Sequence, residues 1–123
     1  MMRFMMIVKH AEKQGTPPKE LMDAIAKLVE GETKAGTMVG TGGLGPTALG
    51  ARVRLSGGQV TVTDGPFTEA KEIIGGYALI EAQSKQEALR NARQFMDLHR
   101  VHWPEFEGEC ELRPLEDYDP PSN

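Results

Sequence analysis

The run Phe4-Met5-Met6-Ile7-Val8 decides how the rest of the chain is arranged. Five consecutive apolar residues, ended by Lys9 and His10, are typical of a short strand that is buried on both faces. A strand of this kind lies in the middle of its sheet, so later strands must pair with it on both sides. We therefore expect residues 4–8 to form the central strand of the domain.

The segment that follows has the pattern of an amphipathic helix. Thr16, ahead of Pro17-Pro18, is suited to cap its first turn, because a proline there loses no donor that the helix needs. Gly36 is placed to end the helix in a left-handed conformation. Between these signals, apolar residues recur at helical spacing, at Leu21, Met22, Ile25, Leu28 and Val29.

The middle of the chain predicts a weak strand and a hairpin. Residues 38–44 favour a short strand that passes into a loop, because nearby glycines weaken it. A hairpin follows, with its turn at Ser56-Gly57-Gly58. One face of this hairpin is apolar, with Val53, Leu55, Val60 and Val62, and the other carries arginines and threonines.

The second half of the chain predicts strand, helix and strand again. Residues 76–80 are typical of a buried strand, and Ser84 with Glu87 forms a capping box ahead of a helix. The helix has an apolar face made by Ala88, Leu89, Ala92, Phe95 and Met96. Cys110 and Leu112 alternate with charged residues in a last strand, which makes Cys110 a buried, inert thiol.

Without its hairpin, the predicted order is βαββαβ, the α+β arrangement called ferredoxin-like, with two helices on one face of an antiparallel sheet. We expect one domain over residues 1–116 and a frayed, acidic, proline-rich tail over residues 117–123. The face of the sheet without helices needs a partner. A homodimer whose sheets face each other is therefore expected.

The composition excludes several classes of protein. The chain has 123 residues, a formal net charge of -4 and one cysteine, Cys110. Net acidity argues against nucleic acid, which requires a clustered basic face. No apolar run approaches the ~20 residues that span a bilayer, and no signal peptide is recognisable. We expect a cytoplasmic protein, without a membrane or nucleic-acid partner, that binds a small molecule or another protein.

The sequence Asp64-Gly65-Pro66-Phe67 directly follows the hairpin and has the chemistry of a rigid bend. The Asp64 side chain can accept hydrogen bonds from nearby backbone amides, Gly65 can adopt dihedrals closed to other residues, and Pro66 fixes its own φ. Phe67 is then expected to anchor the bend in the core. On this evidence Asp64 is either a turn former or a pocket residue.

The segment around this bend closely resembles the signature of the DGPF group within the YCII-related proteins. The resemblance covers nearly the whole chain through matching blocks at residues 2–5, 50–54, 60–67, 71–72, 75–77 and 111–115. It implies a dimeric α/β barrel of ferredoxin-like protomers, in agreement with the pattern above. YCII-related proteins resemble one another in placing an acidic residue and a histidine near a cleft.

That resemblance suggests Asp64 and His10 as catalytic residues. His10 ends the first strand and is expected at the mouth of a cleft between sheet and helices. An Asp–His pair holds the imidazole in one tautomer and raises its basicity, which suits proton abstraction near neutral pH. The alternative is an ordinary histidine at a strand end.

The other candidate ligand-binding residues surround the same bend: Arg52, Arg54, Gly65, Pro66, Phe67 and Tyr77. The two arginines suit an anionic ligand or form a solvated strand face. His99 and His102 share a helical face, which suits a metal site or simply complements the helix dipole. We expect neither a metal nor a cofactor, and residues 40–45 lack the ending of a phosphate-binding loop.

Two functions are compatible with this sequence. The first is a dimeric small-molecule-binding or regulatory module, as the resemblance to proteins encoded near alternative sigma factors suggests. The second is a cofactor-free lyase, isomerase or hydrolase that uses Asp64, with help from His10. The first is preferred, because no complete catalytic constellation is visible.

Overall fold

The computed structural model describes residues 1–116, and the tail expected for residues 117–123 lies outside the described residues. The elements follow one another as β1 (Met2–His10), α1 (Lys19–Lys34), β2 (Met38–Gly43), the short 3-10 helix η1 (Thr47–Leu49), β3 (Ala51–Ser56), β4 (Gln59–Asp64), β5 (Ile73–Ala82), α2 (Lys85–His102) and β6 (Gly108–Pro114). No helix within residues 1–116 is both long enough and apolar enough to span a bilayer.

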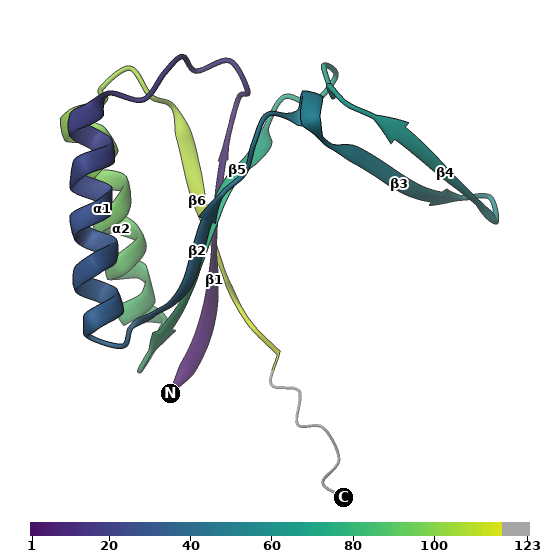
Figure 1. Cartoon of the computed structure of the whole chain (residues 1–123). Coiled ribbons are helices and arrows are strands. Elements are labelled where there is room, and N and C mark those ends of the chain that lie inside the picture. The colour runs from purple at the N-terminus through teal and green to yellow at the C-terminus, as the bar shows by residue number, and fades with distance from the viewer. Residues whose placement is uncertain (117–123) are drawn as a thin grey trace, which may run out of the picture.

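The main sheet has four antiparallel strands in the order β2-β5-β1-β6. Both helices cover one face of this sheet, and the opposite face carries no helix (Figure 1). This α+β arrangement is compatible with the ferredoxin-like fold expected from the sequence. β1 lies between β5 and β6, which confirms that the run from Phe4 to Val8 is an interior strand of the sheet, as β5 also is.

The core lies between the main sheet and the helices. Phe4 on β1 and Ile80 on β5 face each other in register and are 1% and 0% exposed. Ala88 and Ala92 of α2 belong to the same buried cluster. Burial of β1 is one-sided, however: Phe4 is buried under the helices, whereas Met5 is only half-buried on the uncovered face. The expectation that this run is buried on both faces is wrong for the single chain.

The two helices differ in how well their starts are predicted. The expected cap at Thr16 is wrong, because α1 begins at Lys19 and its N-cap is Pro18, without a capping side chain. Each proline disfavours the helical conformation of the residue before it, so the Thr-Pro-Pro segment stays extended. The capping box of α2 is confirmed: the Ser84 hydroxyl oxygen accepts a hydrogen bond of 3.2 Å from the Glu87 backbone N–H.

The end of α1 agrees with the sequence pattern, whereas the apolar face of α2 does so only in part. Gly36, just past the end of α1, has a φ of 80°, which confirms the left-handed termination. Leu89 was expected on the apolar face of α2 but is 47% exposed. The buried residues of α2 are Ala88, Ala92 and His99, so its buried face is narrower than the pattern indicates.

β3 and β4 form a hairpin that we call the arm. They pair only with each other, apart from the main sheet. Its turn has φ values of 57° at Gly57 and 77° at Gly58, as a two-residue hairpin turn requires. The arm projects from the main sheet on the side away from the helices (Figure 1). Its apolar face is therefore open to solvent in the single chain.

Candidate functional site

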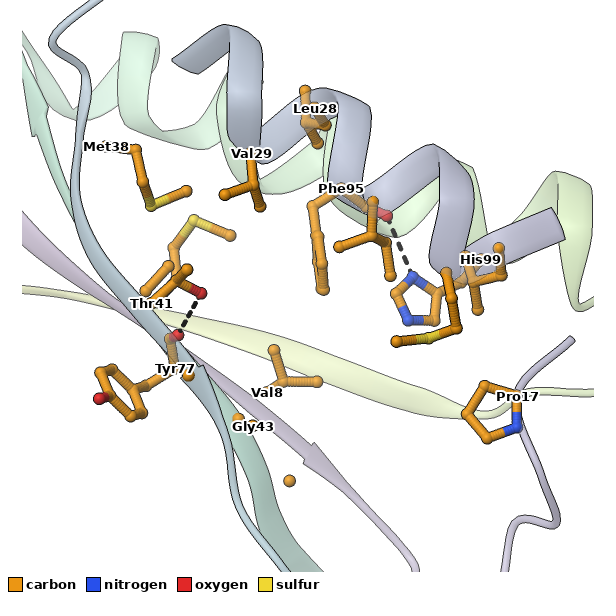
Figure 2. Close-up of a pocket in the computed structure, with 18 of the residues that line it drawn as sticks. Val8, Pro17, Leu28, Val29, Met38, Thr41, Gly43, Tyr77, Phe95 and His99 are labelled. Carbon is orange, nitrogen blue, oxygen red and sulfur yellow. Dashed lines mark hydrogen bonds between the residues drawn. The ribbon is translucent and has the colours of Figure 1, made fainter. Parts of the chain in front are cut away.

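A cavity of about 340 Å³ lies between the two helices and the main sheet, and we call it the inner cavity. This volume is in the range of small-molecule sites. Its walls are mostly apolar, and Figure 2 shows side chains from α1, α2 and the sheet around it. They include Leu28, Val29, Val8, Met38 and Phe95.

One end of the inner cavity is built from aromatic rings, and we call it the aromatic end. It consists of His10, Phe95, His99, Trp103 and Phe106. The His99 ring lies 4.8 Å from the rings of both Phe95 and Phe106, between centroids. The Phe106 ring in turn lies 5.0 Å from Trp103 and 5.7 Å from His10. The last turn of α2 and the loop after it thus meet the end of β1.

His99 is the buried polar residue of this end, at 8% exposure. Its Nδ1 lies 3.1 Å from the backbone carbonyl oxygen of Phe95. Because a carbonyl oxygen only accepts, Nδ1 carries the proton and donates it, which leaves Nε2 as an acceptor in the neutral ring. Burial lowers the pKa of His99 below its ordinary value, and nearby His10 lowers it further against the opposing effect of the Phe95 carbonyl. His99 is therefore held in its neutral form near pH 7.

His10 stands between the inner cavity and a second one. Its Nδ1 lies 2.6 Å from the backbone carbonyl oxygen of Ala11. Its ring occupies the space beside Gly75, where an added Cβ would lie 2.1 Å from the His10 Nε2. A further cavity of about 350 Å³, the outer cavity, shares His10, Trp103 and Phe106 with the inner one. Three residues of the aromatic end thus line both cavities.

The bend at residues 64–67 is held by residues from elsewhere in the chain. The Gly65 N–H donates to the Gly50 carbonyl oxygen at 2.9 Å, and the Phe67 N–H donates to Thr47 Oγ1 at 3.1 Å. Thr47 in turn donates from its hydroxyl and its backbone N–H to the Glu12 carboxylate, at 2.7 and 2.6 Å. These hydrogen bonds lower the pKa of Glu12. The bend is therefore tied to the end of β1 through Thr47 and Glu12.

Gly65 is required in this bend for space. A Cβ at this position would lie 1.7 Å from the carbonyl oxygen of Thr47. The expectation that Gly65 adopts dihedrals closed to other residues is wrong, because positive φ angles occur only at Gly15, Gly36, Gly57 and Gly58 within residues 1–116. The peptide bond between Gly65 and Pro66 is cis.

Asp64 is exposed at the end of β4 and lines neither cavity. Within residues 1–116 its carboxylate accepts no hydrogen bond from His10, from Tyr77 or from the amides of the bend, since Thr47 takes the Phe67 amide. The structure therefore brings His10 together with His99 rather than with Asp64.

The arginine candidates lie on the arm, outside the cavities. The Arg52 guanidinium lies over the Phe67 ring, 3.8 Å from its centroid, and pairs with the Glu69 carboxylate. This pairing lowers the pKa of Glu69. Phe67 is half-buried beneath Arg52 and is absent from the core cluster, so its expected role as a core anchor is wrong. Arg54 is exposed on the same strand as Arg52.

The remaining candidates, Tyr77, His102 and Cys110, differ in where they lie relative to the two cavities. Tyr77 lies along the inner cavity through its backbone, whose carbonyl oxygen accepts from Thr41 Oγ1 at 2.9 Å, while its ring turns away beside Gly42 (Figure 2). His102 lies outside both cavities, and no group of three potential metal ligands occurs in the part of the chain that is described. Burial raises the pKa of Cys110 to about 11, as an inert thiol requires.

Sequence reasoning misses the residues that complete these sites. Trp103 and Phe106 lie three residues apart just after a predicted helix. In the sequence they indicate only that the helix ends there. Glu12 and Thr47 carry no motif, and only their contact across the fold shows their role. The spacing of His99 and His102 was a usable signal, but it drew attention to metals rather than to a buried ring.

Comparison with known proteins places this chain among relatives of undefined activity. The family model described as YCII-related domain matches residues 2–95, which includes every element from β1 to most of α2. An uncharacterized protein of Rhizobium meliloti (strain 1021), R00369, is 38% identical over 87 residues, which are 71% of this chain and 66% of the relative. The matched part of the chain thus spans a little under two thirds of the length of this relative.

Proposed function

Because the chain belongs to the YCII-related family and its relative R00369 is itself uncharacterised, we propose a function from the geometry of the inner cavity. We propose that the protein is a small-molecule-binding module that holds its ligand in the inner cavity. The observation that carries this proposal is an apolar cavity of about 340 Å³ with two histidines at one end. Few convergent polar groups in an otherwise apolar pocket are the usual composition of a ligand site.

A variant that fills the cavity tests this proposal. Val29 lines the inner cavity from α1, so Val29→Phe is expected to abolish ligand binding while the fold is kept. A metabolite that binds at a hundredfold excess over its Kd adds about 2.7 kcal/mol to the free energy of unfolding, which raises the Tm by several degrees. Thermal unfolding in the presence of a metabolite library measures this directly.

The matched control is Ala26→Phe, on the exposed side of the same helix. Ligands that raise the Tm of the unaltered chain should raise that of Ala26→Phe equally and leave Val29→Phe unshifted. Equal stabilisation of both variants would place the ligand elsewhere, and a library without any stabilising compound would count against a binding role.

We further propose that two copies associate through the arm and the uncovered face of the sheet. Val53, Leu55, Val60 and Val62 are 66–73% exposed on one face of the arm, in the cross-strand pairs 53–62 and 55–60. An isolated two-stranded hairpin is at best marginally stable. A second copy that covers this face would explain its composition and lead to the dimeric barrel that the resemblance implies.

Changing one residue on each face of β4 tests the dimer. Val62→Glu places a charge on the apolar face of the arm and is expected to convert the protein to monomers at micromolar concentration. Thr61→Glu adds the same charge to the opposite face and should leave the dimer intact. Sedimentation equilibrium distinguishes the masses. A monomeric unaltered chain would refute the proposal.

The alternative of a cofactor-free enzyme that uses Asp64 receives less support from the geometry. Asp64 is exposed and lines neither cavity, whereas His10 lines both. A regulatory role, and membership of the DGPF group, rest on the resemblance of residues 60–67. In a regulatory module, occupancy of the inner cavity would be the signal.

A further inference from the structure

The ionisable groups around the inner cavity restrict the charge of its ligand. Among the described residues that line it, none is lysine or arginine, and the ionisable ones are His10, Glu32, Tyr77 and His99. Burial raises the pKa of Glu32 and lowers that of His99, so burial favours the neutral form of both. An anionic ligand would enter without a cation to pair with, which is costly in an apolar site. The apolar lining without lysine or arginine thus favours an uncharged molecule over an anion.

His99 restricts the polar group of the ligand. Its Nδ1 is engaged by the Phe95 carbonyl, and Nε2 has no hydrogen-bond partner within residues 1–116. Figure 2 shows this second nitrogen turned toward the cavity. The residue is 92% buried, since 8% of its surface is exposed. No buried side-chain nitrogen or oxygen of the described residues lacks a hydrogen-bond partner, so Nε2 is accessible from the cavity, and a ligand that donates a hydrogen bond there gains affinity.

The rings around His99 restrict the shape of the ligand. The centroids of the Phe95 and Phe106 rings each lie 4.8 Å from the centroid of the His99 ring. The contact with Phe95 is edge-on and the contact with Phe106 is tilted. A planar aromatic ligand can continue this arrangement of edges and faces. A phenolic hydroxyl joins both requirements, because it is a neutral, strong donor attached to a flat apolar ring.

We infer that the inner cavity binds an uncharged aromatic molecule whose hydroxyl group donates a hydrogen bond to Nε2 of His99. This inference rests on the proposed function and adds the class and the orientation of the ligand. The cavity has room for two fused rings, since an engineered cavity of about 150 Å³ holds benzene. His99 is a binding residue in this inference, and no chemical step is assigned to it.

Three probes with the same two fused rings test the inference: 2-naphthol, naphthalene and 2-naphthoate. Trp103, the one tryptophan of the chain, lines the cavity and reports occupancy through its fluorescence. The neutral hydrogen bond should make 2-naphthol bind about tenfold more tightly than naphthalene. The anionic 2-naphthoate should bind more weakly than either.

Matched variants locate the hydrogen bond. His99→Phe keeps a ring of similar size but removes the acceptor, and in this variant 2-naphthol and naphthalene should bind with equal affinity. His102→Phe alters a histidine outside the cavities on the same helix and should change neither value. If His99→Phe does not fold, the comparison of the three probes on the unaltered chain still decides.

The outcomes separate this inference from the proposed function. Equal affinity for 2-naphthol and naphthalene would overturn the role of His99 while the binding function stands. Tightest binding of 2-naphthoate would overturn the uncharged class. Library compounds could stabilise the unaltered chain but not Val29→Phe while none of the three probes bound. In that case only the aromatic class of the ligand would be wrong. If neither probes nor library compounds bound, the proposed function itself would fail.

Discussion

Replacing Gly65 with alanine is expected to lower the free energy of unfolding by about 3 kcal/mol, the upper range for adding a methyl group to a site without space. The Cβ would lie 1.7 Å from the Thr47 carbonyl oxygen and 2.6 Å from its carbon. Both are backbone atoms, so the clash cannot be relieved by a side-chain rotation. Either the bend or η1 must move, and the hydrogen bond from Gly65 to Gly50 breaks with it.

Urea unfolding followed by circular dichroism measures this loss. Gly40→Ala is the matched control, because a Cβ there meets nothing within 4 Å and the backbone is not left-handed. Its free energy of unfolding should stay within a few tenths of a kcal/mol of that of the unaltered chain or rise slightly, since alanine reduces the entropy of the unfolded state. A midpoint for Gly65→Ala equal to that of the control would show that the bend is not held against η1.

Replacing Phe4 with alanine is expected to cost about 3–5 kcal/mol, the usual range for a buried aromatic residue. Phe4 is 1% exposed and lies opposite Ile80 on β5 and Pro114 on β6. Truncation removes its buried ring from the centre of the core and leaves a cavity that strands paired on both sides cannot close. For a domain of this size the loss is a large part of the total stability.

The control for Phe4→Ala lies on the same strand. Met2 is 44% exposed and points to the same face by strand alternation, so Met2→Ala should cost less than 1 kcal/mol. Both values follow from urea unfolding. Equal costs for the two substitutions would mean that the core is not centred on Phe4 and Ile80.

The fold was predictable because its signals are local. The apolar run at residues 4–8, the capping box at Ser84 and the glycine pair in the arm's turn each determine their own element. The exposure of the arm was not predictable. Alternation at Val60 and Val62 shows that one face is apolar, but sequence alone does not show whether this chain or another copy covers it.

The site was predictable only in part, because it depends on contacts between distant segments. The end of β1 places His10 at the cavity wall, as its position in the sequence suggests. Burial of His99 depends on Phe106, which lies in the loop after α2, and no periodicity reports that contact. Similarly, the signature at residues 64–67 drew attention to Asp64, whereas Thr47 and Glu12 make the hydrogen bonds that hold the bend.

The central position of β1 has a consequence for how the protein is made. β1 leaves the ribosome before both of its partners, β5, which ends at Ala82, and β6, which ends at Pro114. At a synthesis rate of about 5–20 residues per second, its apolar run waits seconds for the first partner strand. Unpaired apolar strands aggregate readily during that interval. The nascent chain therefore needs protection first at the segment around which the finished domain is built.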